Sequence, residues 1–218
     1  MGSLSFSPER EMMRRDDFLH TDDAFFQQVA RRCPVGYLSL ITADGYPRSI
    51  ALNFAAKDQA VYFHGALAGE KFDLLSSGVP VGFTMARELS YIPSNWTGPE
   101  YACPATQLFK SVEIKGRCAV VSDLSEKALG LQVLMEKYQP EGSFRPIKAD
   151  EKMYLKALQQ TGVFRVDVES WAGKSRLFQD KPETFLEKVI SKLEERGLPV
   201  DLETVVEMRR IPAGGNSE

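Results

Sequence analysis

Residues 62 to 71 have the residue types of an anion-binding site. They read Tyr-Phe-His-Gly-Ala-Leu-Ala-Gly-Glu-Lys, so the end of a predicted strand passes through small residues into a predicted helix. Backbone N–H groups at the start of a helix attract anions, and Lys71 adds a positive charge in the first turn. The pattern is typical of a phosphate site. It also occurs in ordinary surface loops with a solvated lysine, which are the commoner case.

Other positions carry groups that could bind a ligand. Arg48 follows a predicted turn, where it either pairs bidentately with a phosphate or lies exposed on a hairpin. His64 could donate to a phosphate or a ring oxygen, or be a structural histidine. No carboxylate or second nucleophile lies near His64 in the sequence, so no catalytic dyad is supported and the catalytic residues stay unknown. Residues 171–176 combine a tryptophan ring with polar groups, which suits a planar heterocycle or an ordinary domain edge.

Composition argues against several classes of protein. The formal net charge of −3 and the pI of about 5.6 argue against a nucleic-acid binder. No apolar run approaches the roughly 18 residues that span a bilayer, and no secretory signal is recognisable, so no membrane association is expected. The cysteines (Cys33, Cys103 and Cys118) are too scattered for a disulfide framework, which indicates a reduced, cytoplasmic protein. With two histidines there is no zinc pattern, and no metal is expected.

Periodicity predicts a mainly β protein with helices. Tight turns join the first strands, which must then be antiparallel because parallel neighbours need long crossovers. Six antiparallel strands with peripheral helices suggest a closed or partly closed β-barrel, since closure removes exposed edges. The strands are expected at 35–42, 48–55, 60–64, 81–85, 110–121 and 163–168, and the helices at 22–32 with Thr21 as N-cap, 70–76, about 122–138, 150–159 and 182–197.

The chain organisation predicted from these elements is one barrel with appendages. We expect a flexible arm at 1–20, the barrel domain at 21–181, a helical extension at 182–210 and a flexible tail at 211–218. Residues 88–107 are expected to form a long loop, and loops of that length inside a compact domain are usually functional or flexible.

In their order and spacing, these stretches resemble the FMN-binding split-barrel superfamily, that of pyridoxamine 5′-phosphate oxidase. Within it they are most similar to the branch that contains the nitroimidazole-reductase (Nim) resistance proteins. The motifs that carry the resemblance are GYLSL (36–40), DGYPR (44–48), LNF (52–54), VYFHGA (61–66), GEK (69–71), AC (102–103), FKSV (109–112), LMEKY (134–138) and WAGK (171–174).

The resemblance implies a six-stranded split β-barrel that forms a homodimer with FMN at the subunit interface. Lys71 matches the lysine of a phosphate-binding Arg-Lys pair, but Glu70 stands at the arginine position. Phe178 replaces a histidine with which the oxidases bind pyridoxal phosphate, so oxidation of pyridoxamine phosphate is not expected. The residues implied to bind the cofactor are Arg48, Ser49, Ile50, Ala51, Asn53, Phe63, His64, Gly65, Ala66, Lys71, Ser111, Trp171 and Lys174.

The function implied by the resemblance is that of a flavoprotein oxidoreductase of the nitroreductase kind. Electrons would pass from a nicotinamide donor through FMN to a small planar substrate, with the protein supplying orientation and phosphate neutralisation. Independently of the resemblance, the composition of the predicted loop suggests that the rings of Tyr91, Trp96 and Tyr101 could cover the substrate face. Haem or the deazaflavin F420 on the same barrel, and a flavin-binding protein without turnover, are the alternatives.

Overall fold

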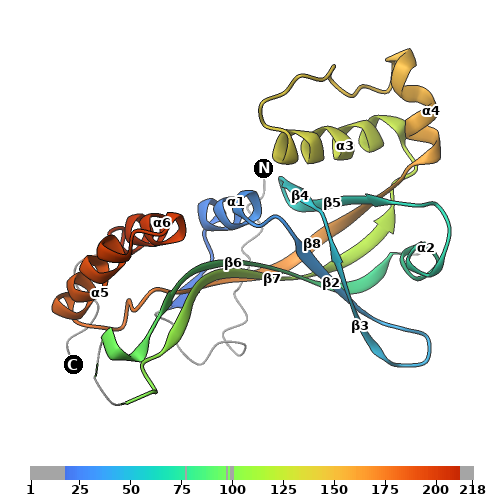
Figure 1. Ribbon diagram of the computed structural model, residues 1–218. Coiled ribbons are helices and arrows are strands. Elements are labelled where there is room, and N and C mark those ends of the chain that lie inside the picture. Colours follow the sequence, from blue (N-terminus) through green and yellow to red (C-terminus); the bar gives the residue numbers. More distant parts are fainter. Residues whose placement is uncertain (1–17, 77, 97, 99–100, 212–218) are drawn as a thin grey trace. The chain divides into compact units, whose positions relative to one another are not determined.

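Eight strands form one antiparallel sheet in the part of the chain that the computed structural model describes, residues 18–76, 78–96, 98 and 101–211. Most of the predicted arm and tail lies outside these residues. The sheet order is β3-β2-β6-β7-β8-β5-β4, with β1 paired to β8 (Figure 1). The strands are β1 (Leu19–His20), β2 (Gly36–Ile41), β3 (Pro47–Leu52), β4 (Ala55–Lys57), β5 (Ala60–Gly65), β6 (Val79–Ile92), β7 (Thr106–Val120) and β8 (Gly162–Arg176).

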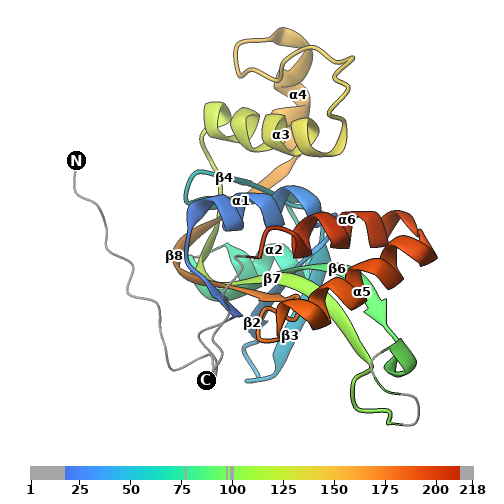
Figure 2. The same cartoon turned by 90° about the vertical axis from the view of Figure 1, so that its left-hand side faces the viewer.

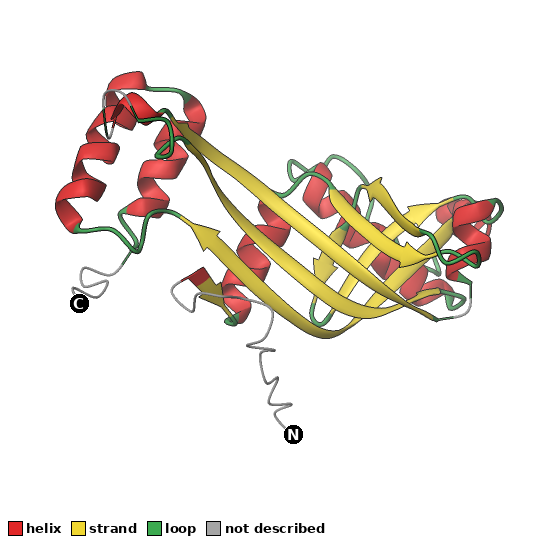
Figure 3. Cartoon of the chain, turned by 90° about the horizontal axis from the view of Figure 1, so that it is seen from below, coloured by secondary structure: helices red, strands yellow, loops and turns green. Residues whose placement is uncertain are grey.

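All six predicted strands form, and β1 and β4 are short additions to them. Strands β6, β7 and β8 are longer than predicted, with 14, 15 and 15 residues, and Figure 3 shows them as long bent ribbons. The prediction of a loop from residue 88 to residue 107 is therefore wrong at both ends. Leu89 and Ile92 extend β6 because their side chains are buried in a hydrophobic cluster, which local sequence does not reveal.

The helices begin and end close to the predicted residues. Asp22 rather than Thr21 is the N-cap of the first helix, because its carboxylate accepts a hydrogen bond of 2.8 Å from the Phe25 N–H. The helices are α1 (Asp23–Arg32), α2 (Glu70–Leu75), α3 (Leu124–Tyr138), α4 (Lys152–Gln160), α5 (Glu183–Arg196) and α6 (Pro199–Met208).

The described residues divide into two compact units, and β6, β7 and β8 each contribute to both. The first unit contains residues 21–85 and 112–172, and the second contains 18–20, 86–111 and 173–211. Aromatic side chains fill the core of the first unit. Phe63 stacks on Phe164 with their centroids 4.9 Å apart, and Phe54 meets Phe83 edge-on at 5.0 Å. All four rings are fully buried, so the core fixes the inner face of the sheet.

The end of α3 holds the connection between β3 and β4. Tyr138 accepts a hydrogen bond of 2.9 Å from the Phe54 N–H, and its hydroxyl lies 2.6 Å from the Pro34 carbonyl oxygen. Lys137 donates to the Phe54 carbonyl oxygen at 2.8 Å, and its amine lies 3.4 Å from the centroid of the Phe54 ring. Burial lowers the pKa of the Lys137 amine to about 8.

The second unit is built around a helical hairpin. Figure 2 shows α5 and α6 side by side, and Gly197 ends α5 with a φ of 66°, in the left-handed region that favours glycine. Pro199 then opens α6, where its fixed φ suits the first helical position. A single helix followed by further chain was predicted for this extension, so α6 is an addition to the prediction.

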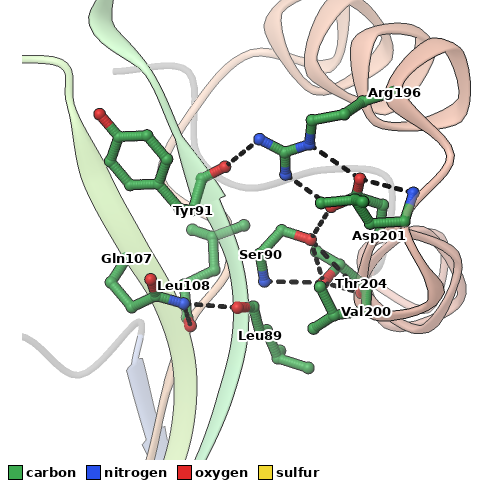
Figure 4. A network of polar contacts seen from close by, with 10 residues as sticks. Leu89, Ser90, Tyr91, Gln107, Leu108, Arg196, Val200, Asp201 and Thr204 are labelled. Carbon is green, nitrogen blue, oxygen red and sulfur yellow. Dashed lines mark hydrogen bonds and ion pairs between the residues drawn. The ribbon is translucent and has the colours of Figure 1, made fainter.

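One buried carboxylate ties this hairpin to β6 within the second unit (Figure 4). The Asp201 side chain is fully buried, and it accepts hydrogen bonds from Arg196 Nε at 2.8 Å and from the Leu198 N–H at 3.0 Å. Ser90 Oγ lies 2.6 Å from Asp201 Oδ1 and 2.8 Å from Thr204 Oγ1. The hydrogen bond from Arg196 and the others from Ser90 and Leu198 hold the Asp201 pKa below its usual value, despite burial.

We expect Lys137→Met to remove a pH dependence of stability. Between the folded pKa of about 8 and the ordinary lysine value of about 10.4, the unfolded chain binds more protons than the folded one. The free energy of unfolding of the natural protein should therefore rise between these pH values, whereas that of Lys137→Met should not. Urea unfolding across this range measures the difference, and the exposed Lys57→Met variant should keep the rise. Parallel curves for Lys137→Met and the natural protein would contradict the assignment.

We expect Asp201→Ala to destabilise the second unit by about 3–5 kcal/mol, because it leaves Arg196 and Ser90 without their buried acceptor. The exposed ion pair between Arg209 and Glu194 provides a matched control, and Glu194→Ala should cost about 1 kcal/mol or less. Because the folded Asp201 pKa is depressed, this stabilisation is present above the ordinary Asp pKa of about 3.9 and is lost as the pH falls through the folded value. Urea unfolding curves of the two variants measure both effects, and equal costs would contradict the role of Asp201.

Candidate functional site

The turn between β2 and β3 brings Arg48 to the start of an edge strand. Gly45 has a φ of 82°, and the Thr42 hydroxyl donates to the Tyr46 carbonyl oxygen at 2.8 Å, which closes the turn. Arg48 lies opposite Leu40 in the antiparallel register, and it is exposed. The local sequence of the turn therefore determines where β3 begins, and Arg48 is the first charged residue of that strand.

Strand β3 presents two different surfaces to a ligand. Ile50 and Leu52 are partly buried and pack against the core, whereas Ser49 and Ala51 are exposed. Because side chains alternate along a strand, Arg48 projects on the same side as Ile50, beyond the edge of the core. The four residues predicted to follow the flavin along this strand thus divide between both faces of the sheet.

The outer face of β2 and β3 is open and partly apolar. Tyr37 and Ile41 are 47% and 66% exposed, and Tyr46 in the turn is 73% exposed. Ser39 lies among them, with its hydroxyl oxygen 3.1 Å from that of Ser49 across the strand pair. Clusters of exposed large apolar side chains commonly mark interaction surfaces.

The start of α2 carries the second cationic group of the candidate site. The side chain of Lys71 turns back over the sheet, and its amine lies 5.8 Å from the Phe63 ring centroid and 5.5 Å from that of Phe164. It occupies the space above Gly65, where an added Cβ would stand 2.4 Å from the Lys71 amine. Gly65 therefore gives Lys71 the room to lie over the aromatic rings. α2 has only six residues and no side-chain cap, so the lysine rather than the helix supplies the positive charge.

An ion pair joins the two elements. Arg48 from β3 forms a salt bridge with Glu70 at the start of α2, 22 residues later in the chain. The two side chains are 44% and 57% exposed, so solvent reaches the pair and its contribution to stability is small. The contact brings Arg48 next to the Glu70–Lys71 sequence, which forms one mixed-charge cluster.

The remaining predicted residues differ in their surroundings. His64, Ala66 and Asn53 are exposed in the first unit, where ligands can reach them. Phe63 is fully buried, so its side chain is a core residue and only its backbone is available to a ligand. Trp171 is half-buried, with its ring 5.1 Å from that of Phe26.

Two predicted residues belong to the second unit. Ser111 is buried near the middle of β7, and the Lys174 amine on β8 lies 5.7 Å from the Phe109 ring centroid. In the same unit the Trp96 ring packs on the Arg196 guanidinium, 4.7 Å away, and belongs to the cluster of the helical hairpin. Its place over a substrate stays a prediction.

Sequence reasoning did not assign a role to two residues that hold the site. Lys137 and Tyr138 fix the backbone of Phe54, directly after the predicted ligand residue Asn53. Their only signal in the sequence was their place in the LMEKY motif. Phe54 and Tyr138 are 84 residues apart along the chain, so no local pattern reveals their contact.

The first unit also has an open cleft elsewhere, of about 940 Å³, which none of the thirteen predicted residues lines. Its walls come from α1, the turn between β4 and β5 and the end of α3. Among the described residues, no three His, Cys, Asp or Glu side chains are grouped to hold a metal ion. No helix in the described ranges is both long and apolar enough to cross a membrane.

Solved structures share this fold. A protein assigned to 5-nitroimidazole antibiotic resistance from Bacteroides thetaiotaomicron matches with a TM-score of 0.56 at 18% identity, over 72% of this chain and 86% of its own. The flavocytochrome Anf3 from Azotobacter vinelandii matches with a TM-score of 0.60 at 20% identity, over 75% and 72% of the two chains. An FAD- and haem-binding protein from Mycobacterium smegmatis matches with a TM-score of 0.57 at 15% identity, over 72% of each chain. At these identities the likeness concerns the fold alone.

Comparison of sequences gives the family. No curated protein matches the chain. The sequence profile described as pyridoxamine 5′-phosphate oxidase matches residues 23–175, from the start of α1 to the residue before the end of β8. That match covers well over half of the chain and includes all thirteen predicted cofactor residues, from Arg48 to Lys174. The chain therefore belongs to the pyridoxamine 5′-phosphate oxidase family.

Proposed function

We propose that the chain is a flavin-dependent oxidoreductase that binds a flavin nucleotide where β3 meets the start of α2. The observation that carries the proposal is the ion pair between Arg48 of β3 and Glu70 at the start of α2, which places Arg48 next to the residue that precedes Lys71 and beside the exposed residues of β3. Membership of the pyridoxamine 5′-phosphate oxidase family supports the choice of a flavin. The resemblance seen in the sequence implies FMN as that flavin.

The residues of this cluster fit a flavin phosphate. Gly65 lacks the Cβ that would displace the Lys71 amine, and Arg48 can form paired hydrogen bonds to phosphate oxygens. His64 and Ser49 are also exposed in this unit, but Ser49 projects from the face of β3 opposite to Arg48, so Ser49 is not counted as a donor to the phosphate. A bound flavin would supply hydride and electron transfer. The protein groups would neutralise the phosphate and hold the strand against which the cofactor lies.

The open face of β2 and β3 suits a second copy of this chain. Tyr37, Ile41 and Tyr46 are large, exposed and contiguous with Ser49, so a partner seated on them would exclude water from the neighbouring cofactor. We propose a homodimer with one flavin beside each β3 strand.

The substrate we propose is a small planar compound such as a nitroaromatic, reduced with electrons from NADH or NADPH. The likeness in fold to a protein assigned to 5-nitroimidazole antibiotic resistance supports testing this class first. Haem is the second candidate, because two relatives in fold are described as a flavocytochrome and as an FAD- and haem-binding protein. Of the two histidines in the sequence, His64 is exposed and His20 lies 2.7 Å from the Ser175 hydroxyl, so His64 is the ligand to test.

The visible spectrum of the purified protein tests this function. We expect a two-band flavin spectrum, either as purified or after incubation with a flavin nucleotide and desalting. Anaerobic NADH or NADPH should then bleach it, and a nitroaromatic should restore it. A sharp Soret band would support haem instead, and bound flavin that neither nicotinamide reduces would indicate a binding protein without turnover. A colourless protein that retains no flavin would overturn the proposal.

We expect Gly65→Ala to weaken flavin phosphate binding about tenfold, or about 1.4 kcal/mol, because its Cβ displaces the Lys71 amine. Equilibrium titration with FMN measures the effect, and riboflavin, which has no phosphate, should bind the variant and the natural protein equally. The control compares the FMN affinity of Lys71→Ala with that of the double variant Gly65→Ala/Lys71→Ala. If Gly65 acts only through Lys71, its substitution has no further effect once the lysine is absent, so the two affinities should be equal. If the losses of FMN affinity caused by the two single substitutions add up in the double variant, Gly65 does not act through Lys71.

A further inference from the structure

We propose that Glu70 selects the charge of the phosphate that this site accepts, and that it favours the pyrophosphate of FAD, with about −1 on each phosphate, over the phosphomonoester of FMN. The inference rests on the proposed function, since it concerns the same flavin site. It names Glu70 as a specificity-determining residue.

The geometry gives Glu70 direct access to the phosphate-binding arginine. Its carboxylate pairs with the Arg48 guanidinium, and both side chains are about half exposed, so the pair is in contact with solvent and can exchange partners. Lys71 follows directly in α2, with its amine turned over Gly65. A phosphate that binds Arg48 therefore either replaces the Glu70 carboxylate or binds beside it, and remains close to it in both cases.

The charges of these three groups sum to one positive charge. Arg48 and Lys71 contribute two positive charges and Glu70 one negative charge. A phosphomonoester such as that of FMN carries about −1.5 to −2 on one phosphate at neutral pH, whereas the pyrophosphate of FAD spreads a similar total over two phosphates, about −1 on each. The phosphate at Arg48 therefore brings less negative charge next to the Glu70 carboxylate when it is one half of a pyrophosphate than when it is a monoester.

The release of Arg48 from Glu70 does not itself discriminate between ligands. That step is common to the monoester of FMN and the pyrophosphate of FAD, so its free energy cancels in the ratio of the two affinities. The repulsion between Glu70 and the additional phosphate charge does not cancel. Removal of the Glu70 charge should therefore benefit FMN more than FAD, and it should not affect riboflavin.

Titration of Glu70→Gln with three flavins tests the inference. We expect FMN to bind about tenfold more tightly than it does to the natural protein, FAD about threefold more tightly, and riboflavin unchanged. The difference between FMN and FAD should narrow at high salt, because both side chains are exposed. Dissociation constants from quenching of flavin fluorescence provide the measurement, so no turnover is needed.

Asp73→Asn is the matched control. Asp73 is also an exposed acid of α2, three residues from Glu70, and its removal changes the net charge by the same amount. We expect Asp73→Asn to leave the ratio of FMN to FAD affinity within about twofold of the natural value, because the ion pair of Arg48 is with Glu70. An equal effect of the two variants would overturn the role of the Arg48–Glu70 pair.

The remaining outcomes separate this inference from the proposed function. If flavins bind but Glu70→Gln leaves the FMN to FAD ratio unchanged, or tightens riboflavin as much as FMN, the charge selection by Glu70 is wrong and the flavin site stands. If neither the natural protein nor any variant retains a flavin, the proposed function falls and this inference falls with it.

Discussion

The candidate site depends on how firmly Phe54 is held. Its ring is fully buried against Phe83, and both polar groups of its backbone are hydrogen-bonded to the end of α3. A buried peptide group needs such partners, since an unsatisfied one is costly. Because Phe54 directly follows β3 and Asn53, this burial and these bonds fix the edge strand that carries Arg48. The exposed half of β3 can then present ligand-binding groups without support from a neighbouring strand on its far side.

The charged cluster beside β3 combines two kinds of cation. Lys71 lies over two aromatic rings and the bare backbone of Gly65, which limits the directions in which it can reach. Arg48 is exposed and engaged by Glu70. One cation is therefore positioned by packing, and the other is held by a carboxylate that a ligand can replace. Such an arrangement links ligand choice to charge more than to shape.

The second unit must hold a buried carboxylate as well as an apolar core. Its helical hairpin buries apolar side chains against Leu89, Ile92 and Leu108, and it also buries Asp201. A buried carboxylate is tolerated only with charged and hydrogen-bonding partners, which Arg196 and Ser90 provide. These bonds join β6 to both helices, so the hairpin is specified by polar contacts as well as by apolar burial.

The sequence by itself determined the features that depend on local signals. Alternation and tight turns placed six strands, caps and proline placed five helices, and ordered short motifs indicated the family that the match over residues 23–175 gives. Only the tertiary structure decided the full lengths of β6 to β8, the helix α6 and the burial of Phe63. It alone paired Arg48 with Glu70 and seated Lys71 over Gly65. The physical reason is that turns, caps and periodicity act over a few residues, whereas burial and ion pairing depend on side chains that the chain brings together from distant positions.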